Sequence, residues 1–135
     1  MTWAQSISVA LLLHYGLDFL LQPRWMAKDK SWRLEVLLLH GLVLVGGFAP
    51  VFGLAFAVWN AVIHCLIDWW VWRIYRKTVV HRILRQSGSA RGYAGTIGNW
   101  KYYEDKMFYD FIGADQLLHV LTLVGLLSAM KEGLL

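Results

Sequence analysis

The sequence lacks the features of several common protein classes. Its single cysteine, Cys65, excludes a disulfide bond within the chain. It has no nucleic-acid-binding motif and no basic helix interleaved with base-stacking aromatic residues, so its net charge of +4 does not indicate a nucleic-acid partner. The N-terminal segment has neither a basic n-region nor a small-residue cleavage site, so we expect no cleavable signal peptide. No lipidation motif is present either.

Long apolar blocks take the place of these features. Hydrophobic residues make up 58% of the 135 residues, which is high for a soluble domain of this size. Pro23 and Pro50 are expected to end the first and second blocks, and the helix of the third is expected to continue through Leu84. The four blocks cover about residues 3–21, 32–48, 51–72 and 109–130. They predict an all-α, single-domain polytopic membrane protein, folded as an antiparallel four-helix transmembrane bundle.

The basic residues predict the orientation of this bundle. Twelve of the thirteen Lys and Arg residues lie in or beside two segments, 22–33 and 73–106, which a four-span topology places on one side. The other side has only Lys131. The positive-inside rule then places both basic connections in the cytoplasm and both termini outside.

Histidine and aspartate recur four residues apart inside the predicted spans. The pairs are His14 with Asp18, His64 with Asp68, and, in reverse order, Asp115 with His119. This spacing puts both members on one helix face, roughly 6 Å apart along the axis. Asn60 extends the stripe of the third span by one more turn. Because polar groups inside lipid are costly, these stripes must face protein, water or a metal ion.

Each predicted span also contributes one histidine at a similar depth. At 1.5 Å per residue, all four histidines lie roughly 10–14 Å from the cytoplasmic edge. They are His14, His40, His64 and His119. The order of the pairs reverses where the chain direction reverses, so the three aspartates all lie about one turn nearer the cytoplasm. We therefore expect one cluster of histidine and aspartate near the middle of the bundle.

Imidazole and carboxylate groups are the usual protein ligands of zinc, iron and manganese, and helical bundles build such sites from facing helices. The four histidines are therefore expected to hold one or two divalent ions. Asp18, Asp68 and Asp115 are expected to be ligands, to orient the imidazoles, or to act as a catalytic base. Three alternatives remain open: a polar network that holds the bundle together, a proton or ion path, and haem with two axial histidines.

A basic connection lies next to the predicted cluster. Gln22, Arg24, Lys28 and Lys30 come directly after the first span, and Gln116 follows Asp115. We expect these side chains to receive an anionic lipid head group or substrate at the cytoplasmic mouth.

The chain resembles a family of small integral membrane proteins of bacteria and phages, a domain of unknown function. The matching motifs are His14-Tyr-Gly-Leu-Asp18, Met26-Ala-Lys28 with Lys30, His40, His64-Cys-Leu-Ile-Asp68 and Asp115-Gln116-Leu-Leu-His119. One departure follows Asp68, where a lysine is expected and Trp69-Trp70-Val71-Trp72 stands instead. The resemblance implies a multi-pass protein of the bacterial cytoplasmic (inner) membrane. A looser likeness is to inner-membrane proteins described as metal-dependent hydrolases.

These observations favour a metal-binding membrane protein, and our first hypothesis is a metal-dependent hydrolase that acts on a membrane-near substrate. Two other function classes compete with it. One is an ion or proton transport protein, although the outer half of the spans is mostly apolar. The other is a non-enzymatic membrane subunit with a structural His/Asp network, partnered in a homo-oligomer or a larger membrane complex.

Overall fold

The computed structural model describes residues 1–87, 101 and 104–135, apart from the side chains of residues 28, 86 and 87. These residues form helices and connections, with no strand among them. The helices are α1 (Trp3–Tyr15), the π-helix η1 (Gly16–Leu20), α2 (Arg24–Asp29), α3 (Leu34–Phe52), α4 (Leu54–Ser87) and α6 (Lys106–Lys131). The expected all-α class is confirmed.

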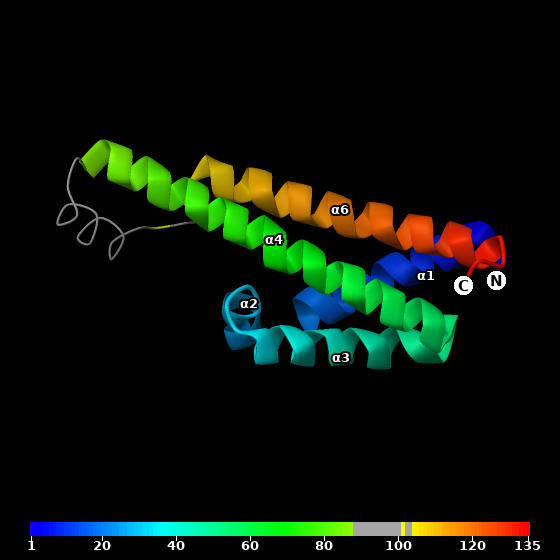
Figure 1. Ribbon diagram of the computed structural model, residues 1–135. Helices are drawn as coiled ribbons and strands as arrows, with labels where there is room; N and C mark the ends of the chain where they lie inside the picture. The colour runs from blue at the N-terminus through cyan, green and yellow to red at the C-terminus, as the bar shows by residue number, and fades with distance from the viewer. Residues whose placement is uncertain (88–100, 102–103) are drawn as a thin grey trace.

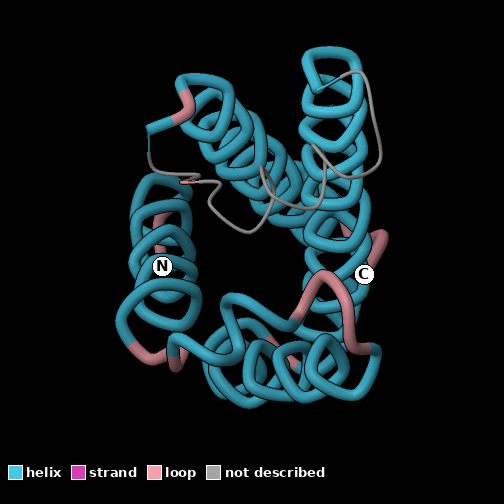
Figure 2. Tube along the Cα trace, turned by 90° about the vertical axis from the view of Figure 1, so that its left-hand side faces the viewer, coloured by secondary structure: helices cyan, strands magenta, loops and turns pink. Residues whose placement is uncertain are grey.

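The four longer helices form a ring. Helix α1 packs against α3 and α6, and α4 packs against the same two helices from the other side. Figure 1 shows both termini at one end of the molecule and α2 at the opposite end, where α4 extends beyond its neighbours. Figure 2, turned by 90°, shows the helices surrounding a common axis. Polar side chains placed on the inner faces therefore meet at this axis.

Within the described part of the chain, three helices are long and apolar enough to cross a membrane: α3, α4 over Leu54–Arg85, and α6. The first expected span is helical over residues 3–20, but it consists of α1 with 13 residues and η1 with 5. Large apolar side chains cover the outer faces, including Leu12, Leu42, Leu66 and Leu121, each more than half exposed. Outward leucine with inward polar groups is the pattern of helices that face lipid.

The prediction that Pro50 closes the second span was wrong. Helix α3 continues through Pro50 to Phe52 and stops at Gly53, whose φ of 87° lies in the left-handed region that favours glycine. Pro50 has no amide hydrogen to donate, but it lies within the last turn, so a kink there displaces only the two residues that follow it in the helix. The reversal between α3 and α4 therefore occurs at Gly53 instead of at residues 47–50.

The first span contains a π-helical turn that the sequence did not predict. The amide of Leu21 donates to the carbonyl of Gly16 at 2.8 Å, a bond across five residues where an α-helix uses four. Asp18 lies within this turn and is buried. Single π-helical turns inside helices are frequently found at functional sites, so the position of Asp18 in η1 is notable.

Two apolar clusters hold the helices together. One fills the end of the bundle near the termini and includes Leu44, Phe48, Phe56 and Leu123. The other joins the extension of α4 to the start of α6 through Tyr75, Val79 and Ile83. There, Arg82 donates to Asp105 at 2.6 Å. The polar cluster lies between these two apolar regions, and the predicted continuation of α4 past residue 72 is confirmed.

Candidate metal centre

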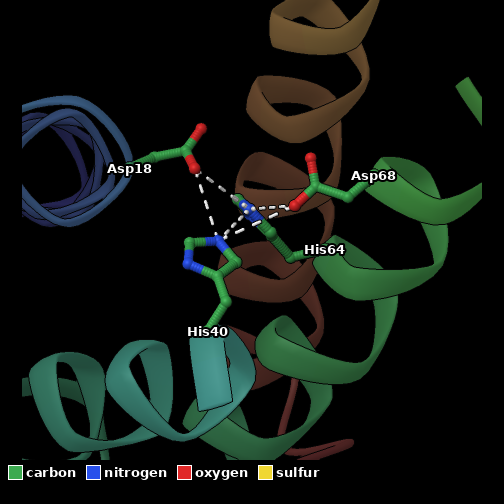
Figure 3. Close-up of side chains that lie close together, drawn as sticks. All are labelled: Asp18, His40, His64 and Asp68. Carbon is green, nitrogen blue, oxygen red and sulfur yellow. Dashed lines mark hydrogen bonds and ion pairs between the residues drawn. The ribbon is translucent and has the colours of Figure 1, made fainter. Parts of the chain in front are cut away.

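Four buried side chains from three helices converge on one point (Figure 3). Asp18 comes from η1, His40 from α3, and His64 and Asp68 from successive turns of α4. Nε2 of His40 lies 3.1 Å from Nε2 of His64 and 3.3 Å from Oδ1 of Asp18. Nε2 of His64 lies 3.3 Å from Oδ2 of Asp68. We refer to Asp18, His40, His64 and Asp68 as the four-ligand group.

The spacing within the four-ligand group matches a tetrahedral ion. Its two remaining nitrogen–oxygen distances, from His40 to Asp68 and from His64 to Asp18, are both 3.7 Å. Zinc bound at 2.0–2.1 Å sets tetrahedral ligand atoms about 3.3–3.4 Å apart. Five of the six ligand pairs thus lie within about 0.4 Å of that spacing before any ion is present.

Two further histidines surround this group. The ring of His119 on α6 stacks on His64, with centroids 3.8 Å apart and planes 10° from parallel. The His14 ring on α1 lies 5.3 Å from His64 and 5.2 Å from His119. The structure thus brings together one histidine from each of four helices, as the shared depth predicted.

Two three-residue groups share members with the four-ligand group. Each offers one ligand atom per residue, and within each group these atoms lie within 4.8 Å of one another. One group consists of His14, Asp18 and His119, and the other of Asp68, Asp115 and His119. Both are buried. All seven metal-ligand candidates from the sequence therefore lie in one connected cluster.

Lys30 completes the base of the cluster. Its Nζ lies 2.9 Å from Oδ1 of Asp18 and 2.9 Å from Oδ2 of Asp68, and its side chain is only 7% exposed. Burial alone would lower the pKa of Lys30, but the two carboxylates outweigh burial and the pKa is raised. The ammonium group therefore stays charged and contacts Oδ1 of Asp18 and Oδ2 of Asp68, the same oxygens that belong to the four-ligand group.

Gln22 fixes the imidazole of His40. Nε2 of Gln22 lies 3.1 Å from Nδ1 of His40, on the far side of the ring from the four-ligand group, and in this orientation the amide donates to Nδ1. Metal binding through Nε2 of His40 requires the proton to sit on Nδ1, from which it would be donated to an oxygen. Rotating the Gln22 amide by 180° would place its oxygen there, so the rotated side chain suits a metal-bound imidazole.

With its carboxylates ionised and its imidazoles neutral, as metal binding requires, the cluster would carry a net negative charge. Its charged members are the carboxylates of Asp18, Asp68 and Asp115 and the ammonium of Lys30, all buried. With neutral imidazoles, three carboxylates against one ammonium leave two negative charges. Burying an unpaired charge costs several kcal/mol per ion, so the site is suited to bind cations.

A pocket of about 700 Å³ opens onto the cluster at the α2 end of the bundle. Asp18, Lys30 and Asp115 line its inner end, while Arg24 and Arg76 line its outer part. Its walls are mostly aromatic and aliphatic, and include Phe19, Trp32, Trp72, Val79 and Phe108. The pocket thus combines basic and apolar surface next to buried carboxylates.

The expected substrate residues fall into two groups. Gln22, Arg24, Lys30 and Gln116 line the pocket, and the side chain of Lys28 lies outside the described part of the chain. Sequence reasoning did not foresee that Lys30 also bridges Asp18 and Asp68, because a lysine in a basic connection gives no signal of burial. It also missed Arg76, which counted only as one of the basic residues of segment 73–106.

Cys65 and Glu35 lie apart from the cluster. The thiol of Cys65 donates to the carbonyl of Leu37 at 3.5 Å, and Glu35 is exposed and paired with Arg33. Neither belongs to a ligand group among the described residues.

No family model, curated protein or solved structure matches the chain. Its function must therefore be argued from the cluster and the pocket.

Proposed function

We propose that the chain is an integral bacterial inner-membrane protein that binds zinc in the four-ligand group. The observation that carries this proposal is the near-tetrahedral spacing of Asp18, His40, His64 and Asp68 before any ion is bound. Two nitrogen and two oxygen ligands in a tetrahedron favour zinc over manganese, which prefers six oxygen-rich ligands. In this proposal α1 and η1 cross the membrane as a fourth span beside the three longer helices.

The proposed activity is metal-dependent hydrolysis of an anionic amphiphile. The pocket supports it, because Arg24 and Arg76 suit an anionic group while Trp72 and Phe108 suit an alkyl chain. The inner end of the pocket reaches the cluster at Asp18 and Asp115. The scissile bond of a bound amphiphile, such as its phosphate ester, would therefore lie next to the buried carboxylates.

The reaction adds water across that bond. A bound divalent ion lowers the pKa of a water molecule that it contacts and polarises the bond under attack. The water oxygen forms a bond to phosphorus, one of its protons passes to a pocket carboxylate, and the phosphorus–oxygen ester bond breaks. The carboxylate then returns the proton to the leaving oxygen. One water molecule is consumed, and no atom is oxidised or reduced.

Two alternatives fit the geometry less well. The Nε2 atoms of His40 and His64 are 3.1 Å apart, which leaves no room for a porphyrin between two axial imidazoles. A transport path would need polar groups that continue toward the termini, but the buried cluster of Leu44, Phe48 and Phe56 fills that end of the bundle. A further alternative is a structural subunit that binds zinc without catalysis, and the experiment must distinguish it from a zinc-dependent hydrolase.

The test is elemental analysis of the detergent-purified full chain. We expect near-stoichiometric zinc in the wild type and its loss from the four-ligand group in His64→Ala. Asn60→Ala is the matched control, because Asn60 is buried one turn away on α4 and belongs to no ligand group. Zinc retained in full by His64→Ala would refute the site. Stoichiometric zinc without hydrolysis of any phosphate ester in a substrate screen would leave a structural metal protein.

A further inference from the structure

The four-ligand group is closed, whereas catalytic zinc sites keep an open position. Four protein ligands complete a tetrahedron, and three of them, His40, His64 and Asp68, do not line the pocket. Structural zinc sites are typically closed in this way, while catalytic zinc has three protein ligands and a water or substrate. An ion in this group would therefore have little access to a substrate in the pocket.

The group formed by Asp68, Asp115 and His119, in contrast, does not complete the coordination of a tetrahedral ion. It offers three ligands, and one of them, Asp115, lines the pocket. Exposed fractions are 0% for Asp68, 3% for Asp115 and 2% for His119, so the atoms are dry except toward that opening. Each of the two groups has one member that lines the pocket, Asp18 or Asp115, but only the group of three leaves a position of a tetrahedral ion open to a substrate.

Four atoms of this group have no hydrogen-bond partner among the described residues. They are both carboxylate oxygens of Asp68, Oδ1 of Asp115 and Nδ1 of His119, and all four are buried. Oδ2 of Asp68 forms an ion pair with Lys30, and Oδ2 of Asp115 accepts a hydrogen bond from Gln116, which leaves Oδ1 of each carboxylate and Nδ1 of His119 for an ion. Because buried polar atoms are nearly always satisfied, an unfilled set of two oxygens and one nitrogen indicates a missing cation.

The charge of Asp115 also favours a cation in this group. Asp18 and Asp68 share the ammonium of Lys30, but Asp115 has no Lys or Arg partner among the described residues. Nδ1 of His119 lies 3.7 Å from Oδ2 of Asp115. The alternative group of His14, Asp18 and His119 has a single carboxylate, which Lys30 already neutralises in part.

From these observations we infer that Asp68, Asp115 and His119 bind a second divalent ion, bridged by Asp68 to the ion of the four-ligand group. Oδ2 of Asp68 faces His64 in the four-ligand group, and Oδ1, which has no partner, remains for the second ion, so this carboxylate would join the two ions. The second ion is the one that meets the substrate, and the first holds Asp68 in place. This inference rests on the proposed zinc site, and it assigns contact with the substrate to the second ion.

The experiment measures zinc per chain after stripping with a chelator, reloading with zinc alone and removing excess by gel filtration. We expect two ions in the wild type and one in Asp115→Asn and in His119→Phe. The phenylalanine keeps the ring stacked on His64 but cannot bind zinc. His14→Ala is the matched control for the alternative group, and it should retain two ions.

The outcomes separate the two proposals. A wild type without zinc refutes both. One ion that is lost in His40→Ala but unchanged in Asp115→Asn keeps the first site and overturns the second. Loss of an ion in His14→Ala but not in Asp115→Asn also overturns this assignment, in favour of the alternative group.

A spectroscopic readout adds evidence that does not depend on activity. With Mn²⁺ in place of zinc, two ions joined by the Asp68 carboxylate are spin-coupled, and the electron paramagnetic resonance signal of isolated Mn²⁺ is absent. Asp115→Asn should restore the six-line signal of a single ion. A wild-type spectrum of isolated ions at two per chain would refute the shared bridge.

Discussion

The Nζ atom of Lys30 lies 2.9 Å from Oδ2 of Asp68, and both side chains are buried. The lysine comes from the connection before α3 and the aspartate from the middle of α4, so this pair ties a connecting segment to the bundle core. The same ammonium also contacts Asp18. A protein charge and a metal ion thus compete to neutralise the same two carboxylates.

Lys30→Met should therefore make stability depend on metal. Removing one partner of a buried ion pair leaves an uncompensated charge, which typically costs about 3–5 kcal/mol. We expect a loss of this order when the chain is metal-free, and a smaller loss when zinc takes over the neutralising charge. Thermal unfolding in detergent, with chelator and with zinc, measures both.

Lys101→Met is the matched control, because Lys101 forms an exposed ion pair with Glu104 whose removal has little effect. Equal destabilisation of Lys30→Met with and without zinc would show that Lys30 does not share the role of the metal.

Gln22 should act through His40 and not only through the pocket. Residues that hold a metal-ligating imidazole typically contribute 10–100-fold to metal affinity. We expect Gln22→Ala to weaken zinc binding by about tenfold or more. Gln22→Glu should keep or raise the affinity, because a carboxylate accepts the Nδ1 proton of His40. Competition with a chromophoric chelator measures the change, and unaltered affinity in Gln22→Ala would contradict this role.

Arg24 and Arg76 should bind the anionic group of an amphiphile without affecting the metal. Loss of one exposed ionic contact, worth about 1 kcal/mol, corresponds to roughly fivefold weaker binding. Short-chain phosphatidic acid is a suitable probe, because Trp32 and Trp72 line the pocket and report its occupancy by fluorescence. Arg24→Ala and Arg76→Ala should each weaken binding while zinc content stays constant.

Arg85→Ala is the control for these two variants, since Arg85 is exposed on the same extension of α4 as Arg76 but does not line the pocket. If all three variants weaken binding equally, the effect comes from the net basic charge of this end and not from the pocket.

The cluster was predictable because helix geometry transfers directly from sequence to space. The rise and period of a helix put His14, His40, His64 and His119 at one level once the chain direction of each span was inferred from the basic residues. The grouping of the ligands was not predictable in this way. It depends on helix rotation, and on the π-helical turn that contains Asp18.

Contacts and conformations outside the local sequence explain the other differences between the predicted and the observed structure. Lys30 is buried because two carboxylates from other helices compensate its charge, which its neighbours in sequence do not reveal. Pro50 looked like a helix end, but Gly53 provides the positive φ that the reversal requires. Both cases follow from contacts or conformations outside the local pattern from which the prediction was made.

The close approach of α3 to η1 provides a last test, because it links packing to the metal site. A methyl group added at Gly47 would overlap the side chain of Leu17, the residue directly before Asp18. Overpacking of this kind costs about 1–3 kcal/mol. We expect Gly47→Ala to lower the unfolding temperature and, by displacing η1, to weaken zinc binding measured on the same sample.

Gly46→Ala is the matched control, since an added methyl group there meets no atom within 4 Å. It places the same substitution in the same helix, so any general effect of alanine on α3 appears in both variants. In Gly47→Ala combined with Leu17→Ala, the space released by Leu17 should offset part of the overlap, giving less than additive losses. Fully additive losses, or equal zinc affinities in the two glycine variants, would show that the position of Asp18 does not depend on this contact.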